Sequence, residues 1–123
     1  MPYRRVGETG IVVDLVGEKG EGPHIGLRAD IDALPIQEQS GLPYASRYPG
    51  VMHACGHDGH TAILLGATYM LNQLKDRFGG RVRSLFQPGE EADGAAWQMI
   101  NQGMLEQPPV DHMLALHLWP HLT

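Results

Sequence analysis

The chain has 123 residues, 42% of them hydrophobic, which is enough to bury one core and predicts a single domain. Its formal net charge is -5 at pH 7 and no lysine or arginine cluster is present, which argues against a nucleic acid or a membrane surface as partner. One cysteine cannot form an internal disulfide, no apolar run reaches the roughly 18 residues of a membrane-spanning helix, and "MPYRRVGETG" lacks the apolar core of a signal peptide. We therefore expect a cytoplasmic protein.

The first half of the chain has two strand-like segments and a loop. Residues 10–17 and 24–33 are rich in branched apolar side chains, and the turn-forming "EKGEGP" between them predicts a hairpin. Residues 34–50 contain three prolines among glycines and serines without helical period. This segment is predicted to be an ordered but irregular surface loop.

The second half alternates between helices and strands. Apolar residues three or four apart from Ile63 until Gly79 and Gly80 predict an amphipathic helix, whose inward positions would be Ile63, Ala67, Met70, Leu71, Leu74 and Phe78. Next come a buried strand "RVRSLFQ", a helix "DGAAWQMINQGM" and a last, nearly continuously apolar strand "DHMLALHLWP" that Pro120 ends. This order predicts an α/β fold with a mixed sheet flanked by helices, and a site at the carboxyl ends of the strands.

The stretch "HACGHDGH" concentrates potential ligands just before the first helix. Cys55 and His57 alternate about Gly56, so a loop could aim both side chains into one pocket as metal ligands. Alternatives are a thiol nucleophile at Cys55 with His57 as its base, or a small buried cysteine without chemistry. For His53 and His60 we favour a structural role, in which they cap the helix or bond a backbone carbonyl.

Two adjacent glutamates, Glu90 and Glu91, follow the strand "RVRSLFQ". Neighbouring carboxylates repel each other and need a positive partner, which a metal ion would supply. One glutamate can then bind the ion while the other takes a proton from water as general base. The alternative is a solvated acidic turn, which the position after an apolar strand disfavours.

Three further polar residues lie in or after apolar strands. His117 in "LALHLWP" needs a partner if it is buried, either a hydrogen-bonding group in the core or a metal ion, and the other strand-end residues favour the ion. Asp30 and Asp32 have the alternate spacing that points two side chains to one face. They could hydrogen-bond to ligand histidines, bind a metal directly, or initiate a turn.

Four stretches in this order, "GLRADIDALPI", "MHACGHDGHTAILLGA", "LFQPGEEADGA" and "LALHLWP", resemble the M20 family of metal-dependent peptidases and amidohydrolases. The branch they are most similar to is the aminoacylase-like one, which includes hippurate hydrolases, N-acyl-amino-acid amidohydrolases and auxin-conjugate hydrolases. The resemblance covers essentially all of 1–123. It implies part of a zinc-peptidase-like catalytic domain, without the inserted lid and dimerisation domain and without the C-terminal segment of longer members.

The resemblance also implies roles for individual residues. Cys55, His57, Glu91 and His117 match ligands for one or two divalent ions, which would be zinc, manganese, cobalt or nickel, with the Cys55 thiolate between two ions. Glu90 matches the catalytic base.

The implied activity is hydrolysis of the amide bond of N-acyl amino acids or related small conjugates by metal-activated water. In other branches a His-x-Asp pair replaces Asp30 and Asp32, so here these aspartates are expected to hydrogen-bond to the ligands. The substrate would be a small N-acyl amino acid or a peptide-like molecule, and the full-length enzyme would be a homodimer. The alternative is a metal-binding but catalytically incompetent domain fragment.

Overall fold

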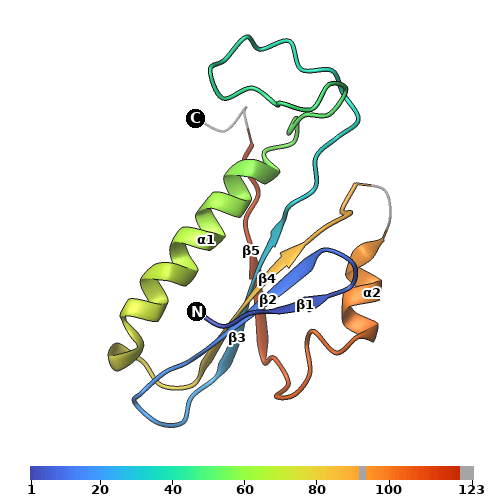
Figure 1. The fold of residues 1–123 in the computed structure, drawn as a ribbon. Helices are drawn as coiled ribbons and strands as arrows, with labels where there is room; N and C mark the ends of the chain where they lie inside the picture. Colours follow the sequence, from blue (N-terminus) through green and yellow to red (C-terminus); the bar gives the residue numbers. More distant parts are fainter. Residues whose placement is uncertain (92–93, 120–123) are drawn as a thin grey trace.

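Five strands form one mixed sheet in the computed structural model, which describes residues 1–91 and 94–119 (Figure 1). The strand order across the sheet is β1-β2-β4-β3-β5, in which β3 runs parallel to both β4 and β5. Helices α1 and α2 cover opposite faces, which confirms the predicted α/β fold. The elements are β1 (Arg4–Val6), β2 (Gly10–Val16), β3 (His24–Asp30), α1 (His57–Gln73), the one-turn 3-10 helix η1 (Lys75–Arg77), β4 (Arg81–Gln87), α2 (Ala95–Asn101) and β5 (His112–Ala115).

The predicted hairpin between β2 and β3 is wrong. Strand β4 lies between them, antiparallel to β2 and parallel to β3. The hairpin that opens the chain is formed by β1 and β2, where Gly7 makes the turn with a φ of 69°. A turn signal such as "EKGEGP" indicates that the chain reverses, but it does not indicate which strand becomes the neighbour.

Strand β4 is the centre of the fold and is buried, as predicted. Phe86 packs with the α1 side of the sheet, whereas Leu85 packs with Met99 of α2 on the other face. Leu85 is fully buried, and six of the seven residues of β4 are buried. Cover on both faces buries polar side chains of this strand as well as apolar ones, since Arg83, Ser84 and Gln87 are all buried.

Helix α1 begins at His57, and only part of the predicted apolar stripe faces the sheet, where Leu71 and Phe78 pack against the core. Ile63 and Met70 are 50% and 60% exposed, whereas Thr68 is buried. Thr68 is polar, but its Oγ1 donates to the carbonyl of Leu64 and lies 2.6 Å from Ser84 Oγ on β4. A hydroxyl with such hydrogen-bond partners can be buried at little cost. The spacing of apolar residues alone therefore did not identify every position that faces the sheet.

The α2 prediction is confirmed, although the helix is shorter than 93–104. Met99 and Met104 are buried against the sheet. Asp93 and Pro120, which the sequence places at the start of this helix and at the end of the last strand, lie outside the described residues.

The last strand is shorter and more exposed than predicted. Strand β5 ends at Ala115, it pairs only with β3 among the described residues, and all its side chains are exposed. His117 therefore follows the strand and is not buried within it. The loop 34–50 is irregular, as predicted, and extends beyond the end of the sheet, where Leu34 and Met52 join its base by two backbone hydrogen bonds of 2.9 and 3.0 Å (Figure 1).

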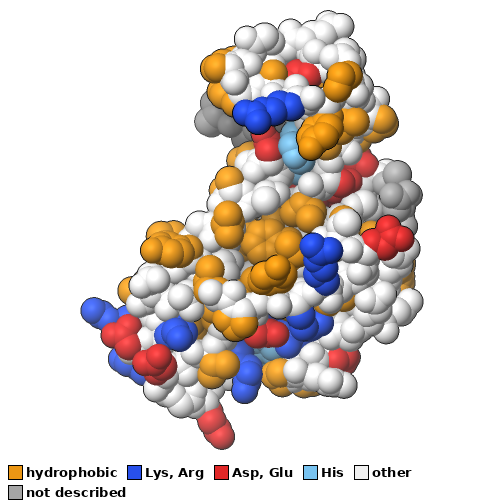
Figure 2. All heavy atoms as spheres, in the orientation of Figure 1, with side chains coloured by type: hydrophobic (Ala, Val, Ile, Leu, Met, Phe, Trp, Pro, Cys, Tyr) orange, Lys and Arg blue, Asp and Glu red, His pale blue; other side chains and the backbone are white. Residues whose placement is uncertain are grey.

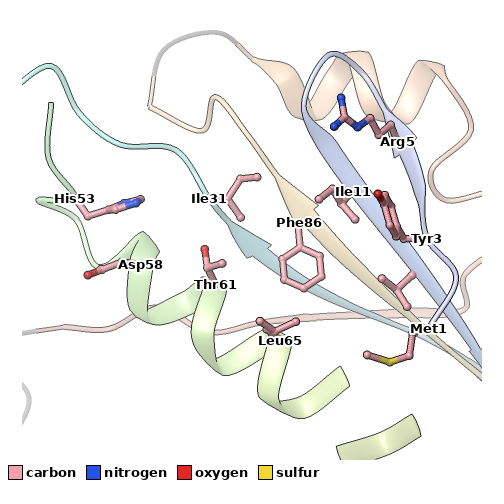
Figure 3. A pocket seen from close by; sticks show the side chains of 11 residues that line it. Met1, Tyr3, Arg5, Ile11, Ile31, His53, Asp58, Thr61, Leu65 and Phe86 are labelled. Carbon is pink, nitrogen blue, oxygen red and sulfur yellow. The ribbon is translucent and has the colours of Figure 1, made fainter. Parts of the chain in front are cut away.

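Apolar side chains are visible on the face of the molecule that carries α1 (Figure 2). Between α1 and the β1–β2 hairpin lies an apolar hollow, and Ile11, Leu65 and Phe86 point into it (Figure 3). None of the helices within residues 1–91 and 94–119 has the length and apolar character needed to cross a membrane.

Candidate metal centre

The predicted site residues meet at one edge of the sheet. The carboxyl ends of the parallel strands β3, β4 and β5 share this edge, and the first turn of α1 lies beside them. His57 is common to three groups of residues whose ligand atoms lie within 4.8 Å of one another. The residues gathered around it are Asp30, Asp32, Cys55, Glu90, Glu91 and His117.

His57 offers a buried nitrogen without a partner. The side chain is 1% exposed, and its Nδ1 lies 3.0 Å from the backbone oxygen of Asp32. Because a carbonyl oxygen can only accept, Nδ1 donates and the neutral ring keeps its lone pair on Nε2. Nε2 is buried and has no hydrogen-bond partner in the described structure. An imidazole lone pair held in this way fits a divalent cation.

Cys55 and His117 bring two further ligand atoms to the same place. Cys55 Sγ lies 3.7 Å from His117 Nε2. His117 Nδ1 donates to the carbonyl of Leu118 at 2.7 Å, so the Nε2 lone pair is directed at the cluster. A hydrogen bond with the Glu91 carboxylate, together with burial and nearby negative charges, raises the pKa of the Cys55 thiol. Such surroundings favour the thiolate only when a cation is present.

Glu90 and Glu91 are exposed and extend from the turn after β4. Glu91 Oε1 lies 3.9 Å from His57 Nε2, and the backbone N–H of Glu91 donates to Asp32 Oδ2 at 3.2 Å. Burial raises the pKa of Asp32, but hydrogen bonds from the backbone N–H groups of Glu90 and Glu91 outweigh it, so the pKa lies below its usual value. Asp32 therefore contacts the ligand candidate His57 and also fixes the turn that carries both glutamates.

Asp30 is 1% exposed and accepts hydrogen bonds at both oxygens. Oδ2 accepts from Arg28 Nη1 at 2.9 Å and lies 3.7 Å from His57 Nε2, while Oδ1 accepts from His60 Nδ1 at 2.6 Å. Burial raises the pKa of this carboxyl, but the His60 hydrogen bond and the Arg28 charge lower it by more. Sequence reasoning missed Arg28, although its alternate spacing with Asp30 on one strand was a readable signal.

The other two histidines of "HACGHDGH" have different surroundings. His60 is 4% exposed, and its ring contacts the Asp30 carboxylate and the backbone N–H of Leu118. Both ring nitrogens of His60 therefore have partners, but these are neither a helix cap nor the backbone carbonyl that we expected. His53 is exposed at the rim of the apolar hollow, which none of the seven predicted site residues lines (Figure 3).

A family model described as peptidase family M20/M25/M40 matches residues 26–123. The chain belongs to this family. The resemblance seen in the four sequence stretches is thereby confirmed.

Several M20 relatives are similar over nearly the whole chain. The chain is 52% identical to the N-acetyl-L-cysteine deacetylase of Bacillus subtilis over 94% of its length. It is 46% identical to the N-acyl-L-amino acid amidohydrolase of Geobacillus stearothermophilus and 45% identical to the hippurate hydrolase of Campylobacter jejuni, over 94% and 96% of its length. A solved M20 structure from Bacillus subtilis, described as a dinuclear metal-binding peptidase, superimposes with a TM-score of 0.90 at 43% identity over 98% of this chain and 34% of that one.

The chain is much shorter than these relatives. It spans 27% of the deacetylase and 30% each of the amidohydrolase and the hippurate hydrolase.

Proposed function

We propose that this chain supplies the metal centre of an amidohydrolase that cleaves the amide bond of N-acyl amino acids or related small conjugates. The observation that carries the proposal is the buried, unpartnered Nε2 of His57, with a thiol, an imidazole and two carboxylates around it. The names of the M20 relatives, which are a deacetylase, an amidohydrolase and a hippurate hydrolase, support the substrate class.

Cys55, His57, Glu91 and His117 would hold the metal. The donor set of one thiolate, two imidazoles and a carboxylate suits one or two ions of zinc, manganese, cobalt or nickel. When bound, the metal lowers the pKa of water and polarises the scissile carbonyl. A thiol ligand must stay reduced, so the proposal includes a reducing compartment such as the cytoplasm.

Glu90 is the proposed general base. Its neighbour Glu91 is fixed through the backbone to Asp32, so the turn holds the Glu90 carboxylate at the same edge of the sheet. There Glu90 accepts a proton from the attacking water and delivers it to the leaving nitrogen. This hydrolysis needs no covalent intermediate, and it leaves Cys55 free to act as a ligand and not as a nucleophile.

A matched pair of variants tests the division of labour between the glutamates. Glu90→Gln is expected to keep its metal and to lose roughly 10²–10⁴-fold in kcat on N-acetyl and N-benzoyl amino acids, because only the proton transfer is removed. Glu91→Gln is expected to lose metal, measured by elemental analysis after dialysis. Glu21→Gln, an exposed glutamate outside the site, is the control. Near-normal turnover of metal-loaded Glu90→Gln would contradict the assignment.

A second candidate is a metal-binding unit without turnover of its own. The observation that favours it is that Cys55, His57 and His117 by themselves place ligand atoms within 4.8 Å of one another, which suits metal binding and does not require turnover. Metal bound at these residues without hydrolysis of any substrate in an acyl-amino-acid panel would support this function. Metal-dependent turnover by the chain itself would exclude it. The homodimer expected for the full-length enzyme stays a prediction.

A further inference from the structure

The segment that carries His117 runs over the first turn of α1. The backbone N–H of Leu118 lies 2.8 Å from His60 Nε2, and His60 Nδ1 lies 2.6 Å from Asp30 Oδ1. A backbone N–H can only donate, so Nε2 accepts and the proton of the neutral His60 ring is on Nδ1, from which it is donated to Asp30. His60 is therefore a bridge between the buried carboxylate at the end of β3 and the backbone next to His117.

These two hydrogen bonds distinguish His60 from the proposed metal ligands. His60, His57 and Asp30 place possible ligand atoms within 4.8 Å of one another, so composition alone would make His60 a ligand. The Nε2 lone pair of His60 already accepts from the backbone N–H of Leu118, whereas Nε2 of His57 has no partner among the described residues. His60 is thus suited to hold the backbone of Leu118, the residue next to His117, and not to bind the metal itself.

Two glycines let Leu118 come this close to the helix. A Cβ at Gly59 would overlap Leu118 Cδ1, and a Cβ at Gly56 would lie 3.3 Å from Leu118 Cβ. Gly56 also has a φ of 82°, which favours glycine. Gly56 precedes α1, whereas Gly59 and His60 lie in its first turn, and we name these three residues, which all lie next to Leu118, the Leu118 seat.

His117 lies in a segment that the sheet does not hold but that packs on the Leu118 seat. Strand β5 ends at Ala115, and residues 116–119 are exposed and belong to no strand. The His117 hydrogen bond to Leu118 is local, so it fixes the ring relative to its own backbone but not relative to Cys55. The rings of His60 and His117 also pack edge to face, with centroids 4.6 Å apart.

We propose that His60 is a positioning residue, which holds the backbone of Leu118 on the first turn of α1 and thereby places His117 beside Cys55. The inference rests on the proposed function in one respect, because it takes His117 as a metal ligand. Residues that orient ligands typically contribute 10–100-fold to metal affinity.

Two substitutions of His60 separate its two hydrogen bonds. His60→Asn retains a donor near the Nδ1 position for Asp30 but has no acceptor that reaches Leu118. His60→Gln places an amide oxygen near the Nε2 position, where it can accept from Leu118. The matched control is His112→Asn, an exposed histidine on β5.

The experiment measures amide exchange of Leu118 by NMR in the metal-free full chain, and Co(II) affinity by competition with a chromophoric chelator. We expect His60→Asn to lose the protection of the Leu118 amide and to bind Co(II) about 10–100-fold more weakly. His60→Gln is expected to recover part of both, and His112→Asn to match the unsubstituted chain. Unchanged Leu118 exchange in His60→Asn, or lost protection with unchanged affinity, overturns the proposal.

A second variant keeps the test decisive if His60→Asn does not fold. Gly59→Val fills the Leu118 seat but keeps both nitrogens of His60, and it is expected to weaken Co(II) binding in the same range. Affinity equal to that of the unsubstituted chain overturns the proposal. Failure of the unsubstituted chain to bind Co(II) would count against the proposed function, whereas the metal-free exchange of Leu118 would still decide whether His60 holds the segment.

Discussion

A buried arginine ties the segment before β5 to the centre of the sheet. Arg83 on β4 is 1% exposed, and its Nε donates to Asp14 Oδ1 at 2.6 Å. Its Nη1 donates to the backbone oxygens of Met104 and Glu106 at 2.9 and 2.7 Å. Asp14→Ala leaves this guanidinium buried without a counter-charge, so we expect it to destabilise the chain.

The expected cost follows from the surroundings of the pair. Removing one partner of a fully buried ion pair costs about 3–5 kcal/mol. Asp14 is 37% exposed and three carbonyls still accept from Arg83, so the cost of Asp14→Ala should be about 2–3 kcal/mol. Arg83→Met removes the buried charge and lets Asp14 regain water, but it leaves these carbonyls without their donor, so it should cost at least as much, about 2–4 kcal/mol.

Urea unfolding of the full chain, followed by circular dichroism, measures both costs. The double variant should cost less than the sum of the two single variants, because each removes the same interaction. Asp76→Ala is the control, since the Asp76–Arg77 pair is exposed and should contribute little. An Asp14→Ala cost as small as that of Asp76→Ala would refute the reasoning that a buried guanidinium without its counter-charge is costly.

Two further predictions concern the surface loop and the exposed helix face. Hydrogen bonds from the Ser40 hydroxyl and the Ser46 backbone N–H lower the pKa of Glu38 below its ordinary value of 4.5. These hydrogen bonds should therefore order the loop fully above pH 4.5, and this order should be lost as the pH falls through the lower pKa of Glu38 in the folded chain. The NMR shift of the Ser46 amide would report the loss. An identical titration of that amide in Glu38→Gln would contradict the prediction. Leu65 and Met70 are 56% and 60% exposed on α1, so the chain should self-associate, as measured by sedimentation velocity. Leu65→Lys and Met70→Lys should weaken this association. A concentration-independent monomer would contradict the prediction.

The correct and incorrect fold predictions have different physical origins. The burial of strand β4 could be predicted, because one short segment carries the apolar residues Val82, Leu85 and Phe86, which pack on both faces of the sheet. The β2–β3 hairpin was predicted wrongly, because strand neighbours are chosen by contacts between segments far apart in the chain. The face of α1 was also misjudged, since the buried hydroxyl of Thr68 depends on Ser84, which lies sixteen residues away.

The sequence by itself determined the chemistry that this protein can offer. A thiol and imidazoles just before and in the first turn of a helix, together with carboxylates after strands, predict a divalent metal and a general base, and four ordered stretches indicate the M20 family. Only the tertiary structure decided which nitrogen of each histidine is free. His57 and His60 belong to one short stretch, but Asp32 leaves the Nε2 of His57 unpartnered while Leu118 occupies that of His60. Hydrogen-bond partners from distant parts of the chain fix a histidine tautomer, and local sequence does not contain that information.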